Sequence, residues 1–221
     1  MKVNKKDAPK LTRNTIITAA VKIADRDGMD SLSMRKVANE LDVEAMSLYH
    51  HIKNKNDLIA GMVEHIAPKI DPPSGDITWQ KAMTKRAHIV KYVLEQHTWA
   101  AHLFISGFND GPRMLKYSDS TVGYLLQAGF SKKLADYAWN IIDSYIYGFN
   151  IQQQDFPIKA SEYKKVAQQY LPYLSKTELP HVRAMTQSIV DGTHDGLQDF
   201  DFGLELIIEG LEKKRSQEIK N

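Results

Sequence analysis

Between Ser47 and Lys55 the chain carries several side chains that can donate or accept hydrogen bonds within a few residues. Ser47, Tyr49 and His51 present hydroxyl and imidazole groups, which suit phosphate oxygens or the polar edges of nucleic-acid bases. Lys53 and Lys55 add ammonium groups, which suit phosphates but carry no information about base sequence. These residue types favour contact with a nucleic acid, provided that they share an exposed surface.

Two very short amphipathic helices, followed by the start of a third, would position these side chains. Ser33 is placed to cap the first helix through its hydroxyl. Apolar residues then recur at helical spacing: Met34, Val37, Ala38 and Leu41. The second segment runs from Glu44 to His51 and directs Leu48 and Ile52 inward. Helices this short are unstable alone, because the nucleation cost is recovered only over roughly a dozen residues. We therefore expect residues 11–28 to form a longer helix that supports both.

The segment 31–58 resembles the DNA-binding signature of the TetR family of bacterial transcriptional repressors. The shared pattern is L-x-M-R-x-V-A-x-E-L-x-V, followed by S-L-Y-x-H-I-x-N-K-x-x-L. In such a helix-turn-helix, the first short helix braces the second so that the second can enter the major groove. Asp42 stands where the family usually has Gly in the turn. Because Asp tolerates a left-handed backbone better than most residues, we expect the turn to survive.

The resemblance also implies which side chains face DNA. We expect Tyr49 and Lys55 to bind phosphates and Arg35 and Ser47 to lie near bases, with Arg35 able to read a guanine. Met46 could contact a thymine methyl group. The full set implied by the resemblance is Arg35, Glu44, Ala45, Met46, Ser47, Tyr49, His51 and Lys55.

Composition sets limits on the class of protein. The 221 residues have a net charge of +2, and 43% of them are hydrophobic, enough for a sizeable core. Residues 1–60 contain 11 Lys and Arg against 8 Asp and Glu, whereas the remainder contains 18 against 19. Basic residues are therefore concentrated around the helix-turn-helix. Lys2, Lys5, Lys6 and Lys10 precede it, as an arm that contacts the DNA backbone or as a solubilising tail.

The absence of cysteines excludes disulfides and thiolate metal sites. With no secretory signal and no membrane-length apolar run, we expect a cytoplasmic protein with no membrane partner.

The remaining sequence predicts an all-α fold with two parts. Residues 1–53 form a three-helix DNA-binding head, and residues 54–75 form a connecting helix and a linker rich in Pro and Gly. Residues 76–221 form a larger helical bundle for effector binding and dimerisation. A polar stretch up to Ser175, which follows a long helix starting at Ser131, is expected to contain one short helix. No strand pattern competes with these helices.

The last predicted helix, residues 200–214, suggests a homodimer. Its sequence is similar to the final helix of the tetracycline-binding members of the family, which crosses a dimer two-fold axis. Gly203 and Gly210 would allow close approach of helices. The residues expected on the dimer face are Phe202, Leu206, Ile207, Gly210 and Leu211. A two-fold dimer would place two reading helices about 34 Å apart on a palindromic DNA site.

The resemblance further implies a small-molecule effector bound in the body, whereas departures of this chain from the family lead us to expect no cofactor and no metal. Where tetracycline-binding members use a Glu to hold Mg²⁺, this chain has Gln152, a poorer ligand for a hard cation. An anionic amphipathic molecule is expected instead, with Arg86 and His88 able to pair a carboxylate. Alternatively, Arg86 is a surface or loop-pairing residue. The candidate effector residues are Met83, Arg86, Val90, His102, Phe104, Trp139, Asp143 and Gln152.

Other functions find less support in the sequence. It contains no HExxH, GxSxG or Gly-rich phosphate loop, and we therefore expect no enzyme. Two alternatives to an effector-released repressor stay open. One is a DNA-binding regulator without a small-molecule effector, and the other is an activator, because the sign of regulation depends on where the DNA site lies.

Overall fold

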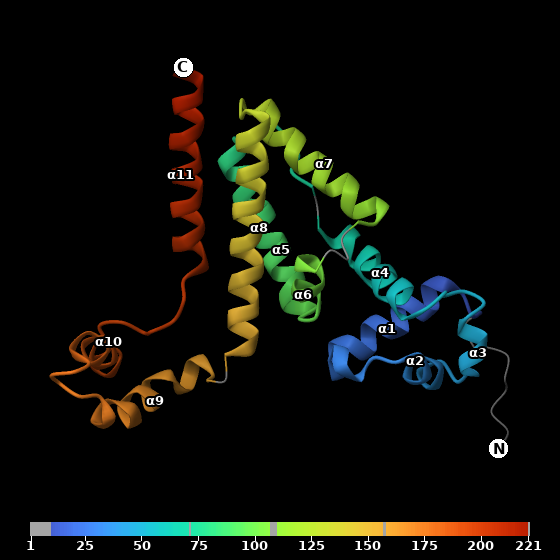
Figure 1. Cartoon of the computed structure of the whole chain (residues 1–221), viewed down its shortest axis with the longest axis horizontal. Coiled ribbons are helices and arrows are strands. Elements are labelled where there is room, and N and C mark those ends of the chain that lie inside the picture. Colours follow the sequence, from blue (N-terminus) through green and yellow to red (C-terminus); the bar gives the residue numbers. More distant parts are fainter. Residues whose placement is uncertain (1–9, 71, 107–109, 157, 221) are drawn as a thin grey trace.

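The computed structural model describes residues 10–70, 72–106, 110–156 and 158–220 (Figure 1). Within these ranges the chain forms α-helices and short 3-10 turns and no β-strand, which confirms the all-α prediction. The α-helices are α1 Arg13–Asp27, α2 Met34–Glu40, α3 Ala45–Leu48, α4 Lys55–Ile66, α5 Trp79–Gln96, α6 Ala100–Ile105, α7 Pro112–Gln127, α8 Lys132–Asp155, α9 Tyr163–Tyr170, α10 Pro180–Asp191 and α11 Phe200–Lys220.

Helices α1 to α3 build the head. Helix α1 starts at a capping box, in which the side chains of Thr12 and Thr15 each accept from the other residue's backbone N–H. Helices α2 and α3 are as short as the sequence predicts, and Ser33 caps α2 by accepting from the N–H of Lys36. Leu48 and Ile52 are fully buried in the core that α1 provides. The long helix thus supplies the packing surface that two short helices need.

The turn between α2 and α3 depends on Asp42. Its φ is 53°, and it is the one residue other than glycine with positive φ in the part of the chain that the structure describes. The expectation that Asp would replace the usual Gly in a left-handed turn is therefore confirmed.

Helix α4 leads from the head to the body (Figure 1). Asn54 caps it by accepting from the N–H of Asp57. On its buried side, a Cβ atom at Gly61 would lie 2.6 Å from Cδ1 of Ile17, so the absence of a side chain lets α4 approach α1 closely. Helix α4 is consequently packed tightly against α1 of the head.

The body is organised around α5 and α8, with α6 and α7 packed on α8 and α11 running beside it (Figure 1). Ser131 caps α8, as predicted, by accepting from the N–H of Leu134. Glu212 of α11 accepts hydrogen bonds from Trp79 Nε1 and Gln80 Nε2, both at 2.9 Å. These bonds hold the last helix to the start of α5.

Helices α9 and α10 pack against each other and form an arm that stands apart from α5 to α8 in Figure 1. Helix α9 is the short helix expected within the polar stretch. The arm exposes several large apolar side chains: Tyr170, Tyr173, Val182 and Met185. Among the described residues, no helix is both long enough and apolar enough to span a membrane.

Candidate nucleic-acid interface and internal polar site

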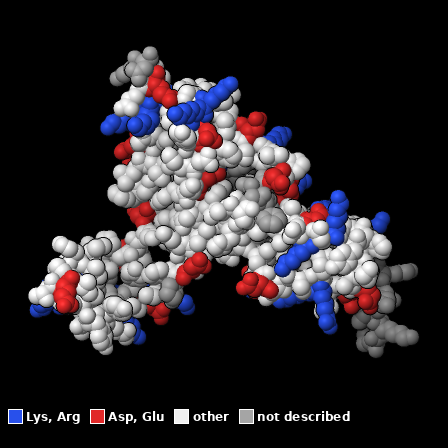
Figure 2. Space-filling view, viewed as in Figure 1, with Lys and Arg blue, Asp and Glu red and all other residues white. Residues whose placement is uncertain are grey.

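The residues predicted to face DNA lie on α2, on α3 and the turns that flank it, and at the start of α4, at the end of the head that is remote from the body (Figure 1). Met46 is 73% exposed, so its apolar side chain is available for contact with a partner. The other exposed members of the set are Arg35, Glu44, Tyr49, His51 and Lys55, whereas Ala45 and Ser47 are half-buried. Figure 2 shows Lys and Arg side chains projecting from the head. Of the basic N-terminal residues, Lys10 is exposed, and Lys2, Lys5 and Lys6 lie outside the described residues.

Arg13 and Asp57 hold this surface in place. The guanidinium of Arg13 donates to both carboxylate oxygens of Asp57, at 2.6 and 2.9 Å, and to the carbonyl oxygen of His51. Asp57 also accepts from the N–H of Lys53 at 2.8 Å. The hydrogen bond from Arg13 lowers the pKa of Asp57 to about 2. One ion pair therefore joins α1 to the first turn of α4, and the hydrogen bonds with His51 and Lys53 hold the loop between α3 and α4.

A second set of charges joins the end of α1 to α2. Asp27 accepts from Arg26 and pairs with Lys36, whose Nζ lies 2.8 Å from a carboxylate oxygen, while Arg26 also reaches Glu40 at 3.3 Å. The hydrogen bonds from Arg26 and then Lys36 lower the pKa of Asp27 to about 2. Helix α2 is thus tied to α1 by charged groups as well as by apolar packing.

Polar contacts also connect the head to the body. Asp25 of α1 accepts from Trp99 Nε1 at 2.7 Å and lies 2.8 Å from His97 Nδ1, at the junction of α5 and α6. Lys69 Nζ lies 2.8 Å from His97 Nε2. At a second contact, Glu64 of α4 accepts from the N–H groups of Arg113 and Met114 and so caps α7. The orientation of the head is therefore set by α1 as well as by α4.

An internal polar site lies between α5, α7 and α8. Arg86 is 1% exposed and donates to Asp143 at 2.5 Å, and the hydroxyl of Tyr147 donates to the other carboxylate oxygen at 3.0 Å. The guanidinium lies over the ring of Tyr117, 5.1 Å from its centroid. A buried pair of this kind is stabilised only when its remaining polar groups find partners.

Three buried polar atoms of this site, and a fourth that lies one helical turn before Asp143 on α8, have no hydrogen-bond partner within the described ranges. They are Arg86 Nε, Arg86 Nη1, Tyr117 Oη and Trp139 Nε1. Buried polar groups are normally hydrogen-bonded, so a group of unpaired ones marks a place where a partner can bind. Sequence reasoning missed Tyr117 and Tyr147, because their role depends on α7 and α8 meeting α5. The sequence signal that could have indicated them is a tyrosine on an otherwise apolar helix face, because a buried tyrosine hydroxyl usually needs a hydrogen-bond partner.

The structure brings six of the eight predicted effector residues towards this site and leaves two elsewhere. Met83 and Val90 lie one helical turn to either side of Arg86, and Trp139 lies one turn before Asp143. Phe104 contacts Tyr147, with ring centroids 5.7 Å apart. His102 is exposed on α6, and Gln152 is exposed near the end of α8.

The expected joint role of Arg86 and His88 is wrong. His88 is exposed, and its Nε2 lies 2.9 Å from Asp201 on α11, whereas Arg86 is buried against Asp143. Because the two side chains have different surroundings, they cannot pair with one carboxylate. The alternative of Arg86 as a surface residue is also wrong, since the side chain is almost fully buried.

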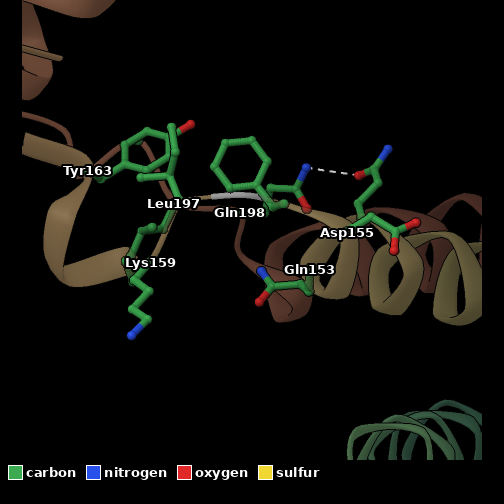
Figure 3. A pocket seen from close by; sticks show the side chains of 11 residues that line it. Gln153, Asp155, Lys159, Tyr163, Leu197 and Gln198 are labelled. Carbon is green, nitrogen blue, oxygen red and sulfur yellow. Dashed lines mark hydrogen bonds between the residues drawn. The ribbon is translucent and has the colours of Figure 1, made fainter. Parts of the chain in front are cut away.

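Gln152 belongs to a separate, open cavity of about 730 Å³ where α8 meets the arm (Figure 3). Tyr163 and Leu197 form part of its apolar wall, and Gln198 donates to the Gln152 side chain at 2.9 Å. In Figure 3 the labelled side chains come from the end of α8, from the start of the arm and from the segment before α11. This cavity is distinct from the internal polar site.

Helix α11 carries the predicted dimer residues on more than one face. Phe202, Leu206 and Gly210 are exposed and Ile207 is half-buried, but Leu211 is only 5% exposed. The grouping of Leu211 with the exposed residues is therefore wrong, because it lies on the inner face with Leu204 and Ile208. Gly203 allows the expected close approach: a Cβ atom there would lie 2.3 Å from the hydroxyl of Tyr145 on α8. Within the described residues nothing lies within 4 Å of a Cβ placed on Gly210.

Comparison with known families agrees with this geometry at both ends of the chain. Residues 16–62 match the family described as bacterial regulatory proteins, tetR family, and residues 71–215 match the tetracyclin repressor-like C-terminal domain. The chain belongs to the TetR family. It is accordingly a DNA-binding transcriptional regulator, and the predicted likeness of its body to that of the tetracycline repressor is confirmed.

Relatives of this TetR-family chain include named regulators. It is 32% identical over 141 residues to an HTH-type transcriptional regulator of Saccharopolyspora erythraea, covering 63% of this chain and 60% of that protein. It is 27% identical to the class D tetracycline repressor of Escherichia coli, covering 92% and 90% of the two chains. Crystal structures of the same fold include ActR of Streptomyces coelicolor in complex with actinorhodin. That structure has a TM-score of 0.78, 25% identity and coverage of 92% and 96%. BioQ with its double-stranded DNA operator has a TM-score of 0.64, 24% identity and coverage of 91% and 98%.

Proposed function

We propose that this regulator is a repressor that binds a palindromic operator as a homodimer and is released from it by a small-molecule effector. The observation that carries the proposal is the exposed surface of α2, α3 and the start of α4, held in a fixed position by Arg13 and Asp57. Met46 and Tyr49 are both exposed on that surface and are free to contact DNA. In this proposal residues 1–53 bind DNA and residues 76–221 bind the effector and form the dimer. Residues 54–75 connect these two parts.

A homodimer follows from the small size of the reading helix. Helix α3 contains four residues, too few to read an operator alone, and two-fold symmetry would double the contact. The outer faces of α8 and α11 are candidates for the interface, because Tyr137, Ile141, Phe202 and Leu206 are all exposed there.

An effector would act by changing how the two heads are placed. The internal polar site adjoins α5 and α7, and α7 is capped by Glu64 of α4. A shift of α7 would therefore move α4, and with it the head. An effector that favours the non-binding arrangement by about 1–3 kcal/mol would change operator affinity roughly 5–150-fold. ActR in complex with actinorhodin is a relative of similar fold that binds a ligand, which supports an effector here.

The two alternatives differ from this proposal in ways that can be measured. A regulator without an effector would keep its operator affinity in the presence of any small molecule. An activator would bind the same operator but raise transcription from the adjacent promoter.

Selection of bound fragments from a random DNA duplex library, at two salt concentrations, tests the proposal. A recovered palindrome with half-sites about one helical turn apart would support a dimeric reader. Binding that is sensitive to salt and blind to sequence would contradict it, because phosphate contacts alone give that behaviour. The recovered operator then serves to measure release by candidate effectors.

A further inference from the structure

The unpaired atoms of the internal polar site share a chemical property. Arg86 Nε, Arg86 Nη1 and Trp139 Nε1 can only donate hydrogen bonds, and the hydroxyl of Tyr117 can donate as well. Burial raises the pKa of Tyr117 well above its usual range, so the hydroxyl keeps its proton at neutral pH. The site therefore offers several free donors. Both oxygens of its one carboxylate, on Asp143, already accept hydrogen bonds from Arg86 and Tyr147.

The charge of the site is already balanced. Arg86 is paired with Asp143 at 2.5 Å, so the pair as a whole carries no net charge that could compensate a second anion. An anionic ligand would bring an uncompensated negative charge into a site where the Arg86 side chain is only 1% exposed. Removing that charge from water costs free energy, which would weaken binding of the ligand. A neutral oxygen acceptor avoids this cost and still satisfies the donors.

The surroundings of the donors are apolar and aromatic. Met83 and Val90 extend the face of α5 on which Arg86 lies, and both are buried. The rings of Phe104 and Tyr147 meet edge to face beside Asp143. Flat aromatic ligands gain from packing on such rings, and a few convergent donors fix their orientation.

From these observations we infer that the effector is an uncharged, largely aromatic molecule whose carbonyl oxygens accept hydrogen bonds from Arg86, Tyr117 and Trp139. The inference rests on the proposed function, because it names the ligand class of the proposed effector site. It replaces the anionic effector that the sequence suggested.

Binding such a molecule requires the site to open. A cavity beside Arg86, between α5 and the linker residues 72–77, has a volume of about 10 Å³, roughly the minimum for one water molecule. The wall formed by the linker is held by Tyr124, whose hydroxyl donates to the carbonyl oxygens of Gly75 and Ile77. Since this linker follows α4 directly, opening the site also disturbs the connection between head and body.

The test uses matched neutral, apolar and anionic probes with the full chain. A panel of aromatic ketones such as 9-fluorenone and 9,10-anthraquinone is compared with the parent hydrocarbons and with the corresponding ring carboxylates, by equilibrium dialysis at neutral pH. We expect at least one ketone to bind at least about ten-fold more tightly than its hydrocarbon and than its carboxylate, which corresponds to one or two hydrogen bonds. Equal or tighter binding of the carboxylates, or no binding of any ketone, would overturn the inference.

Single substitutions test whether the ketones bind at the internal polar site. Tyr117→Phe removes an unpaired hydroxyl, so we expect ketone affinity to fall about ten-fold while the melting temperature of the ligand-free protein stays unchanged or rises. Trp139→Phe should lower ketone affinity in the same way. Tyr145→Phe is the matched control: it removes a hydroxyl on α8 that donates to the carbonyl of Phe200, outside the site, and should leave ketone affinity unchanged. Unchanged affinity in both Tyr117→Phe and Trp139→Phe would refute the assignment.

Failure of the inference and failure of the proposed function give different results. If the selected operator is bound and a carboxylate but no ketone releases it, the repressor function stands and the ligand class is wrong. If ketones bind through Tyr117 and no operator is recovered, the ligand class stands and the repressor function is wrong.

Discussion

Asp57 shows how one side chain can fix a binding surface that it does not itself form. Its carboxylate accepts from Arg13 of α1 and from the N–H of Lys53, at the place where the reading segment passes into α4. The pKa of Asp57 lies at about 2 in the folded protein and near 3.8 when the group is free, so the folded state favours the carboxylate form. The resulting stability is fully present above about pH 4 and is lost as the pH falls towards 2.

At the residue scale we therefore predict that Asp57→Asn lowers the free energy of unfolding at pH 7 by about 1 kcal/mol. The value is modest because Arg13 is 45% exposed and water screens the pair. Urea unfolding of both proteins between pH 7 and pH 3 measures it, and the difference should narrow towards pH 3. Asp76→Asn, in an exposed loop, is the control and should show no difference. A constant difference across the pH range would contradict the ionic role of Asp57.

Arg35 and Lys55 test the two kinds of DNA contact separately. Both are exposed, Arg35 on α2 and Lys55 as the first residue of α4. Lys55→Ala should weaken binding to all sequences and reduce the salt slope by about one unit, because one phosphate contact is lost. Arg35→Ala should instead relax the preference at one base pair of each half-site. The affinity of each variant for the selected operator and for single-base variants of it, measured at two salt concentrations, distinguishes a phosphate contact from a base contact. Lys81→Ala on α5 is the control for the loss of a positive charge alone. If the sequence preference of Arg35→Ala equals that of the parent, Arg35 does not read bases.

At the scale of elements, α1 is tied to the body directly by its own junction, in addition to the connection through α4. Lys69 can only donate, so His97 Nε2 must accept and His97 Nδ1 must carry the proton that it donates to Asp25. Trp99 Nε1 donates to the same oxygen of Asp25, and both His97 and Trp99 are buried. One carboxylate oxygen of the head thus satisfies two buried donors of the body.

Removing this acceptor should therefore cost more than removing a surface charge. We predict that Asp25→Ala lowers the free energy of unfolding by about 2 kcal/mol, because Trp99 Nε1 and His97 Nδ1 lose their partner. Asp25→Asn keeps an oxygen acceptor and should lose less than half as much. Chemical denaturation of both variants at pH 7 provides the comparison. Equal losses would mean that charge, and not the hydrogen bonds, holds the junction.

On the scale of the whole molecule, sequence predicted what depends on local pattern. The spacing from Leu32 to Leu58 and the cap at Ser33 are local, and the head follows them closely. The surroundings of Arg86 are not local, since its partner Asp143 is 57 residues away on a different helix. Periodicity shows that a residue faces inward, but it does not show which side chain it meets there.

Helix α11 shows a second limit of sequence patterns. Its inner face carries Phe200, Leu204, Ile208 and Leu211, and its outer face carries Phe202 and Leu206, two residues further along and so rotated by about 200°. A helix with apolar residues on opposite faces does not reveal which face meets its own core. This is why Leu211 was assigned to the wrong side.

The two faces of α11 lead to a prediction about assembly. If the outer face of α11 joins two copies of the chain, Leu206→Glu should give a folded monomer. The residue is 56% exposed in the single chain, so the fold tolerates the change. In the core of a dimer interface, however, a buried unpaired charge is costly. Leu115→Glu is the matched control, because Leu115 is 57% exposed but lies on α7. Leu211→Glu should instead lower the stability of the fold itself by several kcal/mol, because this side chain is buried in its own chain.

Sedimentation equilibrium with far-ultraviolet circular dichroism separates these outcomes. We expect the dimer dissociation constant of Leu206→Glu to rise at least about 100-fold with helix content retained, and that of Leu115→Glu to stay unchanged. Operator affinity should fall together with dimerisation, because each monomer contacts only one half-site. If Leu206→Glu stays dimeric while Leu115→Glu dissociates, the interface lies on α7, and the two reading helices would have to be placed by a different two-fold axis.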